Sequence, residues 1–494
     1  MAASTTSTAI RQYRNLIGGE WVAPQSGATY QRQSPLTREP LVEIPWSDRA
    51  DADAAIDVAR EAFERGDWAR SHARTRHDIL HQTAARLRED ATALARTLCE
   101  EIGRPWNFCV GEVRLAADVF DYYAGLALDL KGESSPRYDD GSIGLTVREP
   151  VGVVGIITPW NFPLLLVSWK IAPAIAAGCT MVVKPSEFAP SSTFQLAEVI
   201  GAAGAPAGTI NVVTGEGDVV GERLVESPQV NKIAFTGSTA VGKRIMAQAA
   251  PTLKRISLEL GGKSPNVVFP DADLAEAASG AFMGIYLNSG QVCHAGSRLL
   301  VHESIKDAFM ERLIEATRNI QFGDPMAAGT TMGPLINEQQ FERVQRYIQA
   351  GEREGGALIA GGSGYEAVAG YERGLFAKPT IFDAVSPDMA IAQEEIFGPV
   401  LSVLTFRDEA EALALANNTT YGLTAAVWTK HLDTAFRMAK GIQAGTIWVN
   451  TYHSSGLEPT LPYGGYKQSG LGREMGQPGL AEYLETKSIH LKLG

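Results

Sequence analysis

The side chain best suited to chemistry in this sequence is the thiol of Cys293, in the stretch Asn288-Ser-Gly-Gln-Val-Cys-His-Ala-Gly296. The glycines Gly290 and Gly296 let the backbone turn closely on either side of the sulfur. A free thiol has a pKa of about 8.5, so a site that uses Cys293 as a nucleophile at neutral pH must supply a base or a positive field. Because a lone cysteine is more often buried and inert, the hypothesis depends on what else the chain brings to the site.

Two further side chains are candidates for the same site. Asn161 lies between prolines, where it either forms a turn or donates its amide to an oxyanion. Glu259 stands in an apolar strand before two glycines, and is either exposed or desolvated. Desolvation would raise its pKa and make it a general base near neutral pH. His294 is the obvious rival base, but neighbouring side chains diverge in strands and helices, so we expect no direct pairing of His294 with Cys293.

Three other segments follow predicted strands or turns, and ligands of open α/β sheets bind at the carboxyl ends of strands. Lys184 and Glu187 form either a surface ion pair or a binding site for the hydroxyls of a ribose. Gly237 begins a turn and helix typical of a dinucleotide fingerprint, but Thr239 replaces its central glycine, which indicates a phosphate held less closely near the helix N-terminus. The acids of Gln393-Glu-Glu-Ile-Phe-Gly-Pro399 suit the start of a helix.

Composition limits the classes of function. With 494 residues the chain exceeds what one hydrophobic core supports, so two or three domains are expected. A net charge of −12 argues against nucleic acid or an anionic membrane as partner. Four scattered cysteines exclude a disulfide framework and indicate a reduced, cytoplasmic protein. His77 and His81 lie at i and i+4 but lack a third ligand, so we expect no metal site.

The elements that must position these residues are read from hydrophobic periodicity. Apolar runs that alternate with helices indicate a parallel sheet covered on both faces, and a second α/β set begins near Gly261. A strand is predicted at 17–22, helices at 51–65, 74–101 and 110–126, and strands of the first sheet at 151–157, 180–183, 210–213, 233–235 and 266–269. The second set has helices at 305–320 and 338–351 and strands at 401–406, 425–429 and 446–449. A hairpin arm is predicted at 131–148, and the tail 480–493 is expected to pair with it.

The five segments that surround Asn161, Lys184, Gly237, Glu259 and Glu395, taken together with the stretch around Cys293, resemble those of the NAD(P)-dependent aldehyde dehydrogenase superfamily. The signature Pro462-Tyr-Gly-Gly-Tyr-Lys-Gln-Ser-Gly470 is also present, and the likeness runs from about Ile17 to Lys487. The resemblance implies an α/β fold with a Rossmann-like cofactor domain, a catalytic domain and a small β oligomerisation arm in a homodimer or homotetramer. Their expected ranges are 1–130 and 149–260 for the NAD-binding domain, 261–470 for the catalytic domain, and 131–148 and 471–494 for the arm.

The resemblance also implies a mechanism. Cys293 attacks the aldehyde carbonyl while Asn161 and the Cys293 N–H hold the oxyanion, and hydride passes to nicotinamide. Glu259 activates the water that hydrolyses the resulting thioester to the acid, and Lys170 assists proton movement. The positions that match cofactor contacts are Ile157, Trp160, Lys184, Glu187, Gly237, Ser238, Glu395 and Phe397. A carboxylate at Glu187 would repel a 2′-phosphate and favours NAD, although NADP is possible, and the base Glu259 favours hydrolysis over transfer to coenzyme A.

The expected substrate is a medium-sized apolar or aromatic aldehyde, because the matched positions form an apolar corridor. These substrate-tunnel residues are Phe162, Leu166, Trp169, Met283, Leu287, Val292, Ser455 and Tyr463. The loop 452–461 is the least family-like part and is expected to shape substrate choice. Two alternatives stay open: a thiol acyl-hydrolase that uses the cysteine without a cofactor, and a non-enzymatic structural relative.

Overall fold

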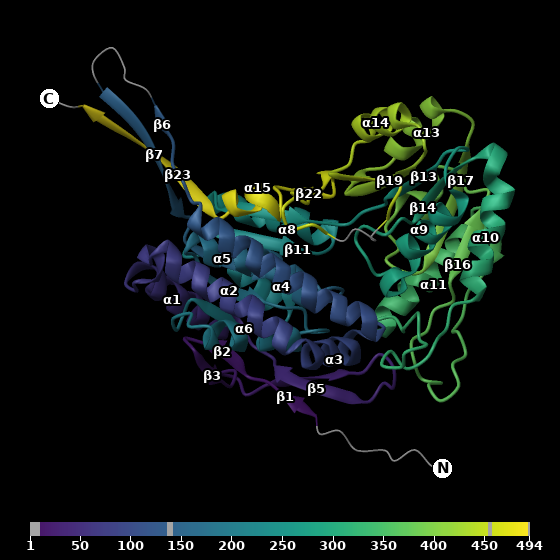
Figure 1. Cartoon of the computed structure of the whole chain (residues 1–494). Coiled ribbons are helices and arrows are strands. Elements are labelled where there is room, and N and C mark those ends of the chain that lie inside the picture. Colours follow the sequence, from purple (N-terminus) through teal and green to yellow (C-terminus); the bar gives the residue numbers. More distant parts are fainter. Residues whose placement is uncertain (1–9, 136–141, 453–456, 493–494) are drawn as a thin grey trace.

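Two large sheets and a projecting arm organise the chain (Figure 1). The structure is a computed structural model that describes residues 10–135, 142–452 and 457–492. None of the described helices is both long enough and apolar enough to cross a membrane. Separate hydrophobic clusters form the cores around the two large sheets.

The first sheet has the strand order β22-β12-β11-β8-β9-β10-β2-β3. Its strands are β2 (Asn15–Ile17), β3 (Glu20–Val22), β8 (Val153–Ile157), β9 (Thr180–Lys184), β10 (Ile210–Val212), β11 (Lys232–Thr236), β12 (Arg255–Glu259) and β22 (Gly470–Leu471). The five central strands are parallel, and β2, β3 and β22 are antiparallel to their neighbours. From β8 the chain winds to β9 and β10, then returns to the other side of β8 for β11 and β12. The switch point between β8 and β11 is where open α/β sheets bind their ligands.

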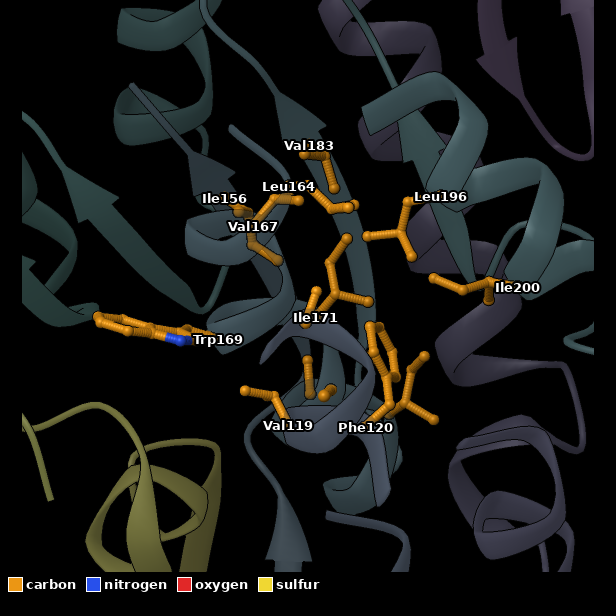
Figure 2. Packing of buried hydrophobic residues seen from close by; sticks show 14 of the residues in the cluster. Val119, Phe120, Ile156, Leu164, Val167, Trp169, Ile171, Val183, Leu196 and Ile200 are labelled. Atoms are coloured by element: carbon orange, nitrogen blue, oxygen red, sulfur yellow. The ribbon is translucent and has the colours of Figure 1, made fainter. Parts of the chain in front are cut away.

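Helices cover this sheet: α1 (Arg49–Glu64), α2 (Ala73–Glu89), α3 (Ala91–Ile102), α4 (Trp106–Leu128), α5 (Pro163–Ala177), α6 (Ser191–Ala202), α7 (Glu222–Glu226) and α8 (Thr239–Ala249). Every residue of α5 is buried, because helices and strands surround it. Figure 2 shows Ile171 of α5 among Phe120 of α4 and Leu196 of α6, and the ring of Trp169, which belongs to the same cluster, lies to one side of them.

The helix predicted at 74–101 is two helices, because Asp90 leaves helical geometry and both ends α2 and begins α3. The break lets each of the two helices pack against α4.

The second sheet has the order β15-β16-β17-β14-β13-β19-β20. Its strands are β13 (Pro265–Val268), β14 (Arg298–His302), β15 (Ala357–Ala360), β16 (Thr380–Asp383), β17 (Val400–Phe406), β19 (Thr424–Trp428) and β20 (Thr446–Val449). Its helices are α9 (Leu274–Tyr286), α10 (Lys306–Arg318), α11 (Glu338–Arg353), α12 (Ala390–Gln393), α13 (Glu409–Asn417) and α14 (Leu432–Gly441). The prediction that 266–269 belongs to the first sheet was wrong. That run is β13, and buried valine-rich strands look alike in either sheet.

The arm is a three-stranded sheet of β6 (Ser134–Ser135), β7 (Ser142–Pro150) and β23 (Leu484–Lys492). β23 runs antiparallel to β7, from Leu484 opposite Pro150 to Lys492 opposite Ser142, which confirms the predicted pairing of tail and arm. Figure 1 shows this sheet extending away from the body. The remaining elements are small: β1 (Arg11–Gln12), β4 (Thr29–Gln33), β5 (Pro40–Pro45), β18 (Tyr421–Gly422), β21 (Tyr466–Lys467) and α15 (Gly476–Ala481).

Candidate active site

The thiol of Cys293 lies where the chain leaves α9 through a strained turn. Asn288, Ser289 and Gly290 have φ values of 49°, 56° and 75°, the left-handed region that costs non-glycine residues energy. A Cβ added at Gly290 would lie 2.2 Å from the carbonyl carbon of Gly398, so this position requires glycine. The strain is offset by hydrogen bonds, among them Ser289 Oγ to the Gly333 carbonyl at 2.7 Å. Cys293 is partly exposed, whereas the other three cysteines are buried.

Cys293 lines two different cavities. One, of about 220 Å³, is bordered by residues that follow β8, β11 and β12 and by Glu395 and Phe397. The other, of about 100 Å³, is walled mainly by apolar side chains. Cys293 therefore borders two separate spaces.

The larger cavity lies at the switch point of the first sheet. Trp160 follows β8, while Gly237 and Ser238 follow β11. The Ser238 hydroxyl caps the eleven-residue helix α8 by accepting from the Val241 N–H at 3.3 Å, so the positive end of that helix faces the cavity. The Trp160 and Phe397 rings meet edge to face with centroids 5.4 Å apart. The cavity thus combines an aromatic wall with a helix terminus suited to a phosphate.

The carboxylate of Glu395 packs against the two glycines that follow Leu260. Gly262 N–H donates to Glu395 Oε1 at 3.2 Å, and a Cβ added at Gly261 would lie 2.4 Å from the other carboxylate oxygen. Burial raises the pKa of Glu395 to about 7, although the Gly262 hydrogen bond opposes this. The helix expected to start near Glu395 instead ends at Gln393, so the acid stands on an extended segment.

Ile157 and Lys184 are the last residues of β8 and β9, and Glu187 follows β9. None of the three is among the described residues that line the larger cavity. Ile157 pairs in register with Lys184, and both side chains approach Gly221, where an added Cβ would lie 3.7 Å from Ile157 Cδ1 and 4.0 Å from Lys184 Cδ. Lys184 Nζ is 3.6 Å from Glu187 Oε2. Burial lowers the pKa of Lys184, and Glu187 opposes this shift. The ion pair leaves Glu187 partly exposed.

Asn161 is buried beside the cysteine, and hydrogen bonds of its side-chain amide and its backbone carbonyl fix its position. Its Nδ2 donates to the Gln291 carbonyl at 3.1 Å, and its backbone carbonyl accepts from Asn288 Nδ2 at 3.1 Å and from Arg104 at 3.2 Å. Because an amide nitrogen carries two N–H groups, one is used by Gln291 and the second can donate to a ligand. Asn161 and Cys293 line the same cavity, as an oxyanion site needs.

Glu259 ends β12 and is buried, which excludes the exposed alternative. Burial raises the pKa of this carboxyl well above its usual value, Glu474 raises it further, and Lys170 and Arg473 oppose the shift. Glu259 Oε2 has no hydrogen-bond partner within the described part of the chain. Glu259 does not line either cavity among these residues, but a Cβ added at Gly262 would lie 2.4 Å from the Cys293 carbonyl oxygen, so the loop after Glu259 touches the cysteine backbone.

Lys170 lies on α5 and is fully buried in a polar network behind Glu259. It forms an ion pair with Glu474 and donates to Thr236 Oγ1 at 2.7 Å. Burial raises the pKa of Glu474, and Lys170 opposes this. Glu474 was missed in the sequence because it stands alone after a glycine-rich turn, and only its antiparallel bridge to Tyr463 brings it to the site.

His294 contradicts the expectation that it would point away from Cys293. Its Nδ1 lies 3.7 Å from the Cys293 sulfur and 3.1 Å from the Tyr463 hydroxyl. The Ala295 N–H bonds to the Val292 carbonyl at 3.0 Å, so Cys293 and His294 are the central residues of a tight turn. The expectation rested on strand or helix geometry, which separates neighbouring side chains and does not apply in a turn.

The smaller cavity contains half of the predicted tunnel. Phe162, Leu166, Trp169 and Leu287 line it with Cys293, whereas Met283, Val292 and Tyr463 do not line it. Tyr463 is buried just behind, with its ring 5.1 Å from that of Trp169. Ser455 lies outside the described residues. Lining residues that sequence reasoning missed are Leu115, Leu165, His294 and Trp448, whereas Leu457, which also lines the cavity, belongs to the loop 452–461 that was expected to shape substrate choice. Most are ordinary apolar residues of helices and strands, which carry no local signal.

His77 and His81 lie side by side but bond to different partners. Their rings stack with centroids 5.9 Å apart, and they bond separately to the Ala124 carbonyl and to Asp121. Within the ranges that the structure describes, there is no group of three or more histidine, cysteine or acidic side chains placed to hold a metal ion.

The site thus combines a cavity at the switch point of a parallel sheet with a second, apolar cavity, and Cys293 borders both. The chain belongs to the aldehyde dehydrogenase family, whose pattern it matches over residues 21–489. It is 42% identical over 488 residues to human retinaldehyde dehydrogenase 3, with 97% of this chain and 92% of the relative covered.

Solved structures give the same result. An NAD-dependent aldehyde dehydrogenase from Sinorhizobium meliloti is 46% identical, with a TM-score of 0.95 over 98% of this chain and 95% of the other. A betaine aldehyde dehydrogenase from Staphylococcus aureus, solved in complex with NAD+, is 41% identical, with a TM-score of 0.95 over 97% of this chain and 95% of the other.

Proposed function

We propose that this protein oxidises an aldehyde to the carboxylic acid with NAD, and that Cys293 is the nucleophile. The observation that carries the proposal is that Cys293 lines both cavities. A thiol placed there meets an aldehyde from the apolar side and a nicotinamide from the other. The relatives that are named as aldehyde dehydrogenases support the same activity.

The larger cavity fits NAD. Gly237 and Ser238 present the N-terminus of α8 to a phosphate, Trp160 and Phe397 offer an aromatic wall, and Glu395 stands ready to accept ribose hydroxyls. We expect Ile157, Lys184 and Glu187 to contact the adenosine ribose, and their mutual proximity supports this. The carboxylate of Glu187 would repel a 2′-phosphate, which favours NAD over NADP. When bound, NAD accepts the hydride that leaves the substrate carbon.

In the first half of the reaction, the Cys293 thiolate attacks the carbonyl carbon and forms a thiohemiacetal. The second N–H of the Asn161 amide and the Cys293 N–H would stabilise the oxygen as it gains charge. One positioned donor of this kind contributes about 3–4 kcal/mol. Loss of the hydride leaves a thioester on Cys293.

In the second half, Glu259 removes a proton from the water that hydrolyses the thioester. Its raised pKa suits a base that works near neutral pH. Lys170, Thr236 and Glu474 form a buried polar network beside it, which offers the proton a path away from Glu259. The buried base supports hydrolysis to the free acid rather than transfer to another acceptor.

The substrate is a medium-sized apolar or aromatic aldehyde. Phe162, Trp169 and Trp448 contribute rings to the smaller cavity, and leucines fill the remaining wall. Such a wall stabilises hydrocarbon and stacks on aromatic rings.

The wider organisation is also a proposal. Residues 1–130 and 149–260 would form the NAD-binding domain, 261–470 the catalytic domain, and 131–148 with 471–494 the arm. The first sheet, the second sheet and the three-stranded arm support this division. The arm ends in the open edge strand β23, and open edges pair with other chains, so we expect a homodimer or homotetramer. Four free cysteines favour the reducing cytoplasm.

A cofactor-linked assay tests the activity. The protein is mixed with NAD and a panel of aliphatic and aromatic aldehydes, and the absorbance of the reduced cofactor is followed, with Cys293→Ser as the matched control. The proposal expects growth of the signal with the native thiol and at least about a hundredfold less with serine. Cleavage of esters without NAD, and no oxidation, would instead identify a thiol acyl-hydrolase. If the protein shows neither aldehyde oxidation nor ester cleavage, it is a non-enzymatic relative.

A further inference from the structure

Three polar atoms meet at the candidate nucleophile. The Cys293 sulfur lies 3.7 Å from His294 Nδ1 and 3.9 Å from the Tyr463 hydroxyl, and that hydroxyl lies 3.1 Å from Nδ1. All three distances are within reach of a hydrogen bond or a small adjustment of one. His294 and Tyr463 are buried, so little water competes for these contacts.

The imidazole is held in place from several sides. The Tyr452 hydroxyl donates to the His294 carbonyl at 2.6 Å. The His294 ring meets Trp448 and Tyr463 edge to face, with centroids 5.7 Å and 6.1 Å away. A side chain that is fixed both at its backbone and at its ring is preorganised to act on the neighbouring sulfur.

The surroundings of the thiol make such help necessary. Burial raises the pKa of Cys293 to about 12, and the carboxylates Glu395 and Glu259 also raise it, while the hydrogen bond from Tyr463 lowers it. The acids that act on the sulfur therefore oppose its ionisation. A base that takes the proton and becomes positive beside the sulfur would reverse this balance.

We propose that His294 is the base that accepts the thiol proton of Cys293, and that Tyr463 orients its imidazole. The S–H bond breaks, an N–H bond forms at Nδ1, and the sulfur keeps the electron pair with which it attacks. A neutral Nδ1 has one lone pair, so it accepts either from the thiol directly or from the Tyr463 hydroxyl as that hydroxyl takes the thiol proton. When the sulfur leaves the acyl group it takes the proton back, so His294 is restored in each cycle.

This division of labour separates two bases. His294 serves the attack of the sulfur, and Glu259 serves the water that later cleaves the thioester. The attack on an aldehyde rests on the proposed function, but the transfer of the proton from Cys293 to His294 does not. It is a property of the free protein and is measurable without NAD or aldehyde.

The test is the pH dependence of Cys293 alkylation by iodoacetamide in the free protein, with Cys293→Ser as the background. His294→Asn keeps a polar atom near the position of Nδ1 but cannot take up the proton. We expect this variant to react about tenfold more slowly at pH 7, with its inflection about one pH unit or more higher than in the native protein. The loss should be recovered at high pH, because there the thiol ionises without a base.

Two further variants and a parallel readout keep the test decisive. Tyr463→Phe should shift the inflection less than His294→Asn, since direct transfer from sulfur to Nδ1 survives. His294→Gln replaces His294→Asn if the latter melts at a lower temperature than the native protein. Superimposable pH profiles for the native protein and a folded His294 variant would overturn the proposal. NAD-linked turnover in the same samples reports separately on the proposed function, because its absence in the native protein leaves the alkylation profiles unchanged.

Discussion

The carboxyl of Glu259 is subject to opposing influences that can be changed one at a time. Burial is the largest and raises its pKa, Glu474 also raises it, and Lys170 and Arg473 lower it. Glu474 is buried with Lys170, while Arg473 is less deeply buried and donates to the carbonyls of Gly465 and Gly472. If Glu259 is the base of hydrolysis, each of these neighbours controls the pH at which the enzyme becomes active.

Glu474→Gln and Arg473→Gln should therefore move the pH profile in opposite directions. Hydrolysis needs ionised Glu259, so turnover rises as pH passes through the pKa of that carboxyl. Removing the negative charge of Glu474 lowers this pKa and shifts the rising limb to lower pH. Removing the positive charge of Arg473 raises it and shifts the limb to higher pH. Steady-state kcat measured across the pH range checks both signs, and shifts in the same direction would exclude Glu259 as the titrating base.

At the scale of single residues, the sequence identifies candidate site residues better than it predicts which of their side chains contact each other. Cys293, Asn161 and Glu259 were found from their neighbours, because prolines, glycines and an apolar strand leave a local pattern. His294 was recognised but placed on the wrong side, since the turn that aims it depends on one backbone hydrogen bond, from Ala295 to Val292.

Among the elements, the turn 288–290 between α9 and Cys293 deserves a direct test because its backbone geometry sets the position of the sulfur. Gly290→Ala places a methyl group against the Gly398 carbonyl in a residue with φ of 75°. We expect a loss of about 2–4 kcal/mol in the free energy of unfolding, together with slower alkylation of Cys293.

The matched control is Gly111→Ala in α4, where an added Cβ meets nothing within 4 Å. In the interior of a helix this change should stabilise by about 0.5–1 kcal/mol. Thermal or denaturant unfolding compares the two. Equal effects of both substitutions would contradict the account of the turn.

Periodicity predicted most elements because buried strands and amphipathic helices have regular patterns. Periodicity gave wrong assignments where one or two residues change the direction of the chain. Asp90 divides a long helical pattern into α2 and α3, and the glycines at 261 and 262 send the chain from β12 into the other sheet. The assignment of β13 to its sheet depends on pairing with β14 and β19, which lie far along the chain.

At the scale of the whole molecule, the arm is the part that extends away from the two large sheets (Figure 1). β23 covers one side of β7 along nine residue pairs and leaves its own outer edge open. Deletion of residues 486–494 removes this edge, so we expect the native oligomer to dissociate into smaller species. Light scattering coupled to size exclusion measures the mass. Lys487→Gln, which removes an exposed ion pair with Glu149, is the control and should keep the native mass.

An unchanged mass after the deletion would show that the arm does not hold subunits together. The pairing of β7 with β23 was predictable because residues 143–147 alternate apolar and polar side chains and the tail is strand-like at its end. What the arm binds is not encoded in that alternation, since any open edge of suitable register satisfies the same hydrogen bonds.

The central claim is that Cys293 carries an acyl group which Glu259 releases, and one rapid-mixing experiment on Glu259→Gln tests it most directly. With NAD and a good aldehyde, the variant should produce a burst of reduced cofactor equal to about one per active site, followed by turnover slowed about 10²–10⁴-fold. Mass spectrometry of the quenched sample should find the acyl group on Cys293. Steady turnover at the native rate, with no acyl group on Cys293, would contradict the account.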